Sequence, residues 1–215
     1  MVRCDGTSRR HGLDAARMKW IDERENLYPR GVPGLPGAHR RLRDGERFTI
    51  GAHSWRVVVG YGHSPEHASL YCESLGLFIA GDMLLPRIST NVSVWPNEPE
   101  SDPVGEFLDS LTRYTALPPD TLVLPSHGLP FRGLHARVNA LREHHRTRLT
   151  SVTGVCATPQ AAVDVLPVLF DRTFDDHHLL FAMGEGIAHL NYLMHRGTLR
   201  RTAGGDGVYR FVRAE

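Results

Sequence analysis

Three side chains of metal-binding type stand at equivalent places in the sequence, each just past an apolar stretch. They are His63, Asp82 and His127. Imidazole and carboxylate groups are ligands that zinc accepts in proteins. If each apolar stretch is a strand, the three side chains project from strand ends into a common cleft, where functional loops usually lie. The pattern therefore predicts a metal site built from these residues.

Each of the three residues also has an ordinary interpretation. A histidine in a glycine-rich turn, such as His63, is often a hydrogen-bonding loop residue. Asp82 follows a glycine and could be a turn or cap residue, and His127 precedes Gly128 and could end a helix or lie in a loop. The joint pattern favours the metal site over the three separate interpretations.

The elements that must position these residues begin as strands. From Glu46 onward, apolar and polar residues alternate with the period of two that is typical of a half-buried strand. Strands are predicted over residues 48–50, 55–59, 68–72, 75–80 and 122–124. Residues 103–117 have apolar side chains at helical spacing, and Asp102 is a plausible N-cap. The expected order is strands, then a helix, then a further strand.

Helical spacing dominates the chain after Gly128. One helix is predicted around residues 134–149, a second opening at Thr158-Pro159, and a third opening at Asp175 or Asp176 and closed by Gly197. The histidine pairs 144–145 and 177–178 are predicted to be solvated or core positions, because neighbours on a helix do not face each other. Residues 198–202 and 208–212 predict a hairpin. Three helices followed by a two-stranded ribbon are the outline of a winged helix.

These elements predict three segments. Residues 1–41 are expected to be a lead-in, with a helix over 13–27 and an irregular loop over 28–37 that is rich in proline and glycine. Residues 42–131 are the strand-rich segment. Residues 132–215 form a second, C-terminal domain.

Composition excludes several classes of protein. The 25 basic and 24 acidic residues give a formal net charge of +1, which favours neither a nucleic-acid footprint nor a funnel for acidic substrates. The cysteines, Cys4, Cys72 and Cys156, form no CxxC pair, so a disulfide scaffold is not expected and a reducing cytoplasm is the simplest location. No apolar run approaches the roughly 18 residues of a membrane span.

Three motifs resemble the metallo-β-lactamase superfamily of hydrolases. GHSPEHASLY resembles its GHTPGHxxxY signature, LFIAGD resembles the strand that ends in its metal-bridging aspartate, and LVLPSHG resembles its last histidine motif. The segment FAMGEGIAHLNYLMHRGTLRR followed by GVYRF is similar to the winged-helix domain that follows the hydrolase fold in a hydroxyacylglutathione-hydrolase-like subgroup. The resemblance covers the chain from about residue 42 to its end.

The resemblance implies an α+β fold, a two-sheet αββα sandwich flanked by helices. It also implies a centre of two zinc ions, with His63 as a ligand of the first metal, Asp82 as the carboxylate that bridges both, and His127 as a ligand of the second. His67 matches a position that usually binds no metal. A metal-bound hydroxide would be the nucleophile, acting on a small-molecule substrate of ester or thioester type.

The family's HxHxDH motif, which supplies two ligands to each metal, is absent from the sequence. The chain is therefore expected to be the C-terminal half of the sandwich followed by a winged helix, through truncation or through natural loss of catalysis. In either case we expect a partial site, weak metal binding, and little or no hydrolysis. Half a sandwich exposes an apolar sheet face, so a homodimer that covers this face is a further expectation.

The loop after Asp82 is the candidate for substrate contact. Arg87 could hold an anionic group and Trp95 an apolar one. The alternative is that this loop packs onto the first half of the sandwich.

Two other functions are kept open, a catalytically silent structural or interaction protein and a winged-helix nucleic-acid binder. The ribbon carries Arg200, Arg201 and Arg210, but residues 132–215 hold too small an excess of arginine for a basic stripe. Nucleic acid and membrane are thus not the expected partners.

Overall fold

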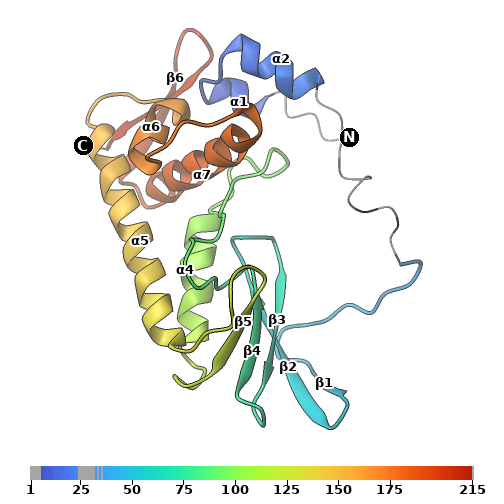
Figure 1. Ribbon diagram of the computed structural model, residues 1–215. Helices are drawn as coiled ribbons and strands as arrows, with labels where there is room; N and C mark the ends of the chain where they lie inside the picture. Colours follow the sequence, from blue (N-terminus) through green and yellow to red (C-terminus); the bar gives the residue numbers. More distant parts are fainter. Residues whose placement is uncertain (1–5, 24–31, 33, 35, 215) are drawn as a thin grey trace.

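A five-stranded sheet forms one end of the molecule, and a group of helices forms the other end (Figure 1). The computed structural model describes residues 6–23, 32, 34 and 36–214. The strands of the sheet, in their spatial order, are β1 (Arg47–Ile50), β2 (His53–Gly60), β3 (His67–Cys72), β4 (Leu77–Gly81) and β5 (Leu122–Pro125). All five lie where the alternation of apolar residues predicts them.

The directions of the strands decide where their ends meet. Strands β1 to β4 pair antiparallel in succession, whereas β4 and β5 pair parallel. Strands β2, β4 and β5 therefore run in the same direction and finish at the same edge of the sheet. Helix α4 (Pro103–Tyr114) makes the crossover between β4 and β5. The loops that leave this edge are the ones that carry the predicted metal ligands.

Helix α4 covers one face of the sheet. Its N-cap is Asp102, as predicted, whose carboxylate accepts a hydrogen bond from the backbone N–H of Gly105 at 2.9 Å. The Tyr114 ring packs on Phe78 of β4, with ring centroids 5.1 Å apart. Val58 of β2 is buried on the same face. This packing joins the sheet to the helices in one hydrophobic core.

The other face of the sheet is also apolar. The strand registers place these side chains on it: Trp55, Val57, Val59, Ala68, Leu70, Cys72, Leu77, Ile79, Leu122 and Leu124. Ile79 is 37% exposed, Ala68 is also exposed, and Leu70 is half-buried. A sheet with one face in water normally alternates apolar and polar residues, whereas strands covered on both faces read as continuous apolar runs. The strands of this sheet therefore have the apolar pattern that is typical of a sheet covered on both faces.

The C-terminal part consists of three helices and a hairpin. They are α5 (Leu134–Val155), α6 (Ala162–Leu169), α7 (Asp176–His195), β6 (Leu199–Ala203) and β7 (Tyr209–Arg213). Asp175 caps α7 by accepting from the backbone N–H of His178, as predicted, and Gly197 follows the helix with φ +70°. The succession of elements is the one expected, and its identity as a winged helix stays a prediction.

The predicted start of the second helix is wrong. Helix α6 begins at Ala162 rather than at Thr158-Pro159. Gln160 instead exchanges two backbone hydrogen bonds with Phe211 of β7, at 2.9 and 2.8 Å, so this stretch is held extended against the hairpin. The helix start is marked by Asp164, whose carboxylate accepts from the backbone N–H of Ala161.

Two N-terminal helices pack beside the C-terminal elements, far from the sheet (Figure 1). They are α1 (Thr7–Arg10) and α2 (Ala15–Glu23). The buried ring of His11, just after α1, stacks on Phe211 with centroids 5.9 Å apart, and its backbone C=O accepts from Val163 at 3.2 Å. Met18 of α2 is buried in the common core. The predicted lead-in helix is thus present over Ala15–Glu23, while most of the predicted loop over 28–37 lies outside the described residues.

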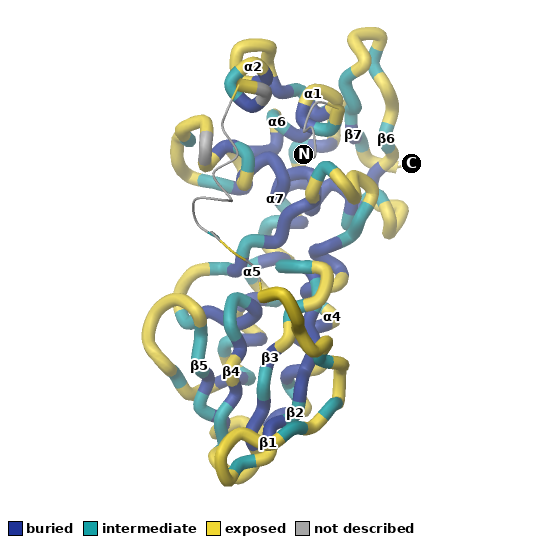
Figure 2. The backbone as a smooth tube through the Cα atoms, turned by 90° about the vertical axis from the view of Figure 1, so that its right-hand side faces the viewer, coloured by how far each residue is buried: buried dark blue, intermediate teal, exposed yellow. Residues whose placement is uncertain are grey.

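The buried residues lie mainly along the helices that connect the two ends of the molecule (Figure 2). Helices α4 and α7 are buried along much of their length, and the core runs through them without interruption. The boundary expected near residue 131 stays a prediction. Within the part of the chain that the structure describes, no helix is both long enough and apolar enough to cross a membrane.

Candidate metal centre

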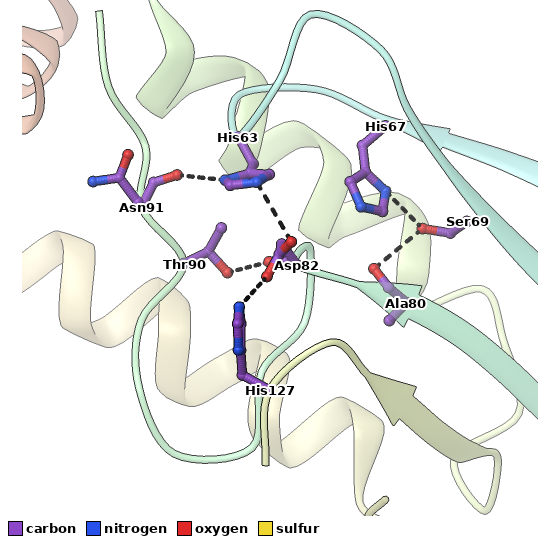
Figure 3. A network of polar contacts seen from close by, with 8 residues as sticks. All are labelled: His63, His67, Ser69, Ala80, Asp82, Thr90, Asn91 and His127. Atoms are coloured by element: carbon purple, nitrogen blue, oxygen red, sulfur yellow. Dashed lines mark hydrogen bonds and ion pairs between the residues drawn. The ribbon is translucent and has the colours of Figure 1, made fainter. Parts of the chain in front are cut away.

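The three predicted ligand residues lie at one edge of the sheet. His63 follows β2, Asp82 directly follows β4, and His127 follows β5. Because these strands run in the same direction, their loops leave the sheet side by side. Figure 3 shows the Asp82 carboxylate between the two imidazole rings. The sequence pattern therefore brings together the side chains that it singled out.

Both imidazoles turn an Nε2 atom toward the same carboxylate. The Nε2 atom of His127 is 3.3 Å from Oδ1 of Asp82, and the Nε2 atom of His63 is 3.8 Å from Oδ2. His63 and Asp82 are about one-third exposed, at 29% and 30% of the side chain, whereas His127 is 67% exposed. The group is thus open to solvent chiefly on the side of His127.

Contacts with residues 90–91 hold the side chain of His63 and the backbone of Asp82. The Nδ1 atom of His63 lies 2.9 Å from the backbone C=O of Asn91, which can only accept, so Nδ1 is the donor and the neutral tautomer that fits this contact has its lone pair on Nε2. The Thr90 hydroxyl donates to the backbone C=O of Asp82 at 2.6 Å. Such outer contacts orient metal-binding histidines and fix their tautomer. The loop of residues 90–91 therefore positions His63 and Asp82.

His67, which is expected to bind no metal, lies next to His63 (Figure 3). Its Nδ1 atom is 3.4 Å from the hydroxyl of Ser69, and its ring centroid is 6.2 Å from that of His63. A Cβ atom at Gly81 would stand 2.6 Å from the His67 ring, so a glycine is required there. Burial lowers the pKa of His67, because it disfavours the charged form of the ring.

The residues fit a metal ion by donor type and by spacing, but as an incomplete set. Two ligands of one tetrahedral zinc ion, each about 2.0–2.2 Å from it, stand about 3.3 Å apart, close to the separation of His127 and Asp82. Among the described residues, however, no group of three or more His, Cys, Asp or Glu side chains is arranged to hold a metal ion. His63, Asp82 and His127 do not form such a group by themselves, and their role as metal ligands stays a prediction.

Comparison with known proteins gives this geometry its context. The family model described as "Metallo-beta-lactamase superfamily" matches residues 7–127. The model described as "Metallo-beta-lactamase-like, C-terminal domain" matches residues 149–214. The chain belongs to the metallo-beta-lactamase superfamily. The first match begins at residue 7. The resemblance was expected to begin only at about residue 42, so the expected extent was too short.

Solved structures of the superfamily have the same fold over nearly all of this chain. A beta-lactamase domain protein from Burkholderia ambifaria is 50% identical, with a TM-score of 0.92 over 97% of this chain and 60% of its own. A metallo-beta-lactamase family protein from Thermus thermophilus is 31% identical, with a TM-score of 0.76 over 96% of this chain and 63% of its own.

Curated relatives match shorter parts. The probable metallo-hydrolase YqjP of Bacillus subtilis is 28% identical over 163 residues, which are 74% of this chain and 50% of that protein. A hydroxyacylglutathione hydrolase of Fuscovulum blasticum is 32% identical over 93 residues, which are 43% of this chain and 34% of that protein. The chain thus spans half or less of the length of these curated relatives.

The two residues predicted to contact substrate lie in different pockets of this superfamily member. Arg87 lines an open pocket of about 520 Å³ together with Ile88, His127 and Leu129. Trp95 lines a smaller pocket of about 130 Å³ against α7. The structure therefore places Arg87, but not Trp95, in the same pocket as the predicted ligand His127.

Sequence reasoning missed the part that Thr90 and Asn91 play. Both lie in the loop predicted to contact substrate, but their contacts are with His63 and with the backbone of Asp82. The sequence carried a weak signal, a polar stretch placed directly after the aspartate. It could not show that a backbone carbonyl, which every residue has, would be the group that orients His63.

Proposed function

We propose that this chain contributes to a metal-dependent hydrolase that cleaves an ester or thioester bond. The observation that carries the proposal is the approach of two imidazole Nε2 atoms to the Asp82 carboxylate, at 3.3 Å for His127 and 3.8 Å for His63. Members of this superfamily usually bind metal ions. We propose zinc, with two ions in a complete centre, because the ligand types are histidine and carboxylate.

Each residue has a defined part in this proposal. His63 and His127 would each present a neutral Nε2 lone pair, and Asp82 would offer one oxygen toward each histidine. A bound zinc ion supplies a hydroxide nucleophile at neutral pH, because it lowers the pKa of its water to about 7. Arg87 would hold an anionic group of the substrate in the pocket that it shares with His127.

We propose further that the remaining ligands come from polypeptide without a counterpart in this sequence. Two facts support this, the absence of an HxHxDH motif and the 60% share of the Burkholderia ambifaria structure that the chain covers. The alternative is that this protein has naturally lost the HxHxDH motif and, with it, catalysis. The likeness to a hydroxyacylglutathione hydrolase supports a place in that subgroup. A winged-helix identity for residues 132–215 and a cytoplasmic location complete the proposal.

Zinc titration of the purified chain tests the metal site. We expect weak zinc binding that falls about tenfold or more in Asp82→Asn and in His127→Ala, measured by isothermal titration calorimetry after chelation. Hydrolysis of p-nitrophenyl acetate should stay near background. His53→Ala is the matched control, because His53 starts β2 at the opposite end of the sheet and contacts Ser74.

Two outcomes would contradict the proposal. Zinc affinity that is unchanged in both ligand variants would show that these residues do not bind the metal. Two tightly bound zinc ions together with rapid ester hydrolysis would show that the set is complete, contrary to the incompleteness argued above.

The nucleic-acid alternative is disfavoured by the contacts of two of the three ribbon arginines, Arg201 and Arg210. Arg201 pairs with Glu100 at 2.9 Å and lies over the Tyr209 ring, while Arg210 pairs with Asp206 at 2.8 Å. Arginines held by carboxylates are poorly placed to neutralise phosphates.

A further inference from the structure

The second pocket, between the loop after Asp82 and helix α7, has a composition unlike that of the metal centre. Its floor is an apolar stripe of α7 that includes Leu180, Met183 and Ile187. Val94 and Trp95 form the facing wall. Met183 and Ile187 are buried, whereas Trp95 is 48% exposed, which leaves a large aromatic side chain at the mouth.

The contact between the loop and α7 depends on a glycine. A Cβ atom at Gly184 would stand 2.9 Å from Cβ of Ser93, closer than real Cβ atoms come. The backbone N–H of Val94 donates to the C=O of Gly184 at 3.0 Å. The Gly-Glu-Gly stretch within FAMGEGIAHL thus allows the loop to lie directly on α7 and shape this pocket.

Helix α1 contributes the remaining polar rim. Thr7 and Ser8 line the same pocket as Trp95. The N-terminal helices therefore help to build a pocket that lies next to the loop carrying Thr90 and Asn91.

Short contacts connect this pocket to the metal centre. The Ser93 hydroxyl, in the pocket wall, donates to the side-chain oxygen of Asn91 at 2.8 Å. The backbone C=O of Asn91 in turn accepts from Nδ1 of His63 at 2.9 Å. A group held against Ser93 would therefore lie beside Asn91, the residue that orients His63.

The volume sets the size of a ligand. About 130 Å³ is close to the roughly 150 Å³ of an apolar cavity that binds benzene, so the pocket suits a group of about six carbon atoms. It has no charged lining residue. We propose that this pocket binds the short apolar acyl group of the substrate, which would place the acyl chain on α7 and the anionic leaving part near Arg87. The proposal rests on the hydrolase function proposed above and names its substrate class.

A series of neutral amides tests the acyl pocket without any need for metal or turnover. Acetamide, butanamide, hexanamide and decanamide would be titrated into the full chain, with the methionine methyl groups followed by NMR and Met183 assigned through Met183→Leu. Each buried methylene should tighten binding about fourfold up to hexanamide, with no further gain at decanamide. The Met183 methyl should shift saturably, and that of Met83, beneath Gly60, should not.

Matched variants locate the bound chain. Trp95→Ala should weaken hexanamide binding about tenfold, because the wall of the pocket is removed. Leu129→Ala removes an exposed apolar side chain from the Arg87 pocket and should have no effect. The reverse order of the two variants, an absence of saturable binding, or gains that continue to decanamide would each overturn the acyl pocket. Because zinc is absent from this experiment, its failure and the failure of the metal site are separate results.

Discussion

At the scale of single residues, the most unusual environment outside the metal centre is that of His145. It is fully buried between helices, and neither ring nitrogen has a hydrogen-bond partner among the described residues. Its ring stacks on buried His189 at 5.4 Å and lies edge-on to Phe107 at 5.5 Å. Burial lowers the pKa of His145 to about 3 and that of His189 to about 4.

These pKa values predict a loss of stability in acid. The unfolded chain takes up protons near pH 6.5, whereas the folded chain does not, so stability is complete above pH 6.5 and falls as the pH drops toward 4. His145→Leu should change stability at pH 7 little, because it removes an unpaired polar ring. Between pH 7 and 4.5 the wild type should lose roughly 2–3 kcal/mol more than the variant in urea unfolding.

The comparison of variant with wild type isolates this effect from its surroundings. Buried Glu185, paired with Arg148, has a raised pKa and acts in the opposite direction, but it is present in both proteins. His195→Leu, at an exposed position, is the control and should keep the wild-type pH dependence. Equal acid sensitivity of His145→Leu and wild type would contradict the interpretation.

At the scale of elements, helix α5 holds the loop that follows Asp82. The Arg137 guanidinium donates to the backbone C=O of Leu85 at 2.6 Å and to that of Ile88 at 2.7 Å. Arg137→Met should leave both carbonyls without this donor and cost about 1–3 kcal/mol of unfolding free energy. It should also weaken zinc binding, because the loop carries Thr90 and Asn91.

A neighbouring arginine on the same helix is the control for this prediction. Arg142 donates to the hydroxyl of Thr112, an exposed side chain, so Arg142→Met should cost less than about 1 kcal/mol. Equal stability of the two variants by urea unfolding would show that Arg137 does not hold the loop.

Elements of regular period could be predicted from the sequence, whereas those that depend on distant partners could not. The alternation around Trp55 and the cap at Asp102 are local signals, and both were confirmed. The start of α6 was missed because Gln160 pairs with Phe211, fifty-one residues away, which no local signal reports. The metal-type side chains were found by type and position, but the groups that orient them were not.

At the scale of the whole molecule, the outer face of the sheet predicts self-association. Six apolar side chains of this face are exposed or half-buried and form a surface of the kind that marks an interaction site: Ala68, Leu70, Leu77, Ile79, Leu122 and Leu124. In a pure preparation the available partner is a second copy, so we predict a concentration-dependent dimer in sedimentation velocity. Ile79→Lys, at a position 37% exposed, should shift it to monomer without unfolding it.

A lysine at another exposed position tests whether loss of the dimer in Ile79→Lys comes from the added charge alone. Thr49→Lys places the same charge on the edge strand β1 and should leave the dimer intact. A wild-type chain that stays monomeric at every concentration would refute self-association through this face.

The loop after Asp82 has a consequence for how proteins with this arrangement can diverge. Its middle, Thr90 and Asn91, orients metal-type residues, while its flanks reach two pockets, Arg87 on one side and Trp95 on the other. New substrate preferences can therefore be acquired by substitutions at the flanks, one pocket at a time. Insertions or deletions between the flanks would carry the change into the candidate metal centre, so selection should vary the composition of this loop far more readily than its length.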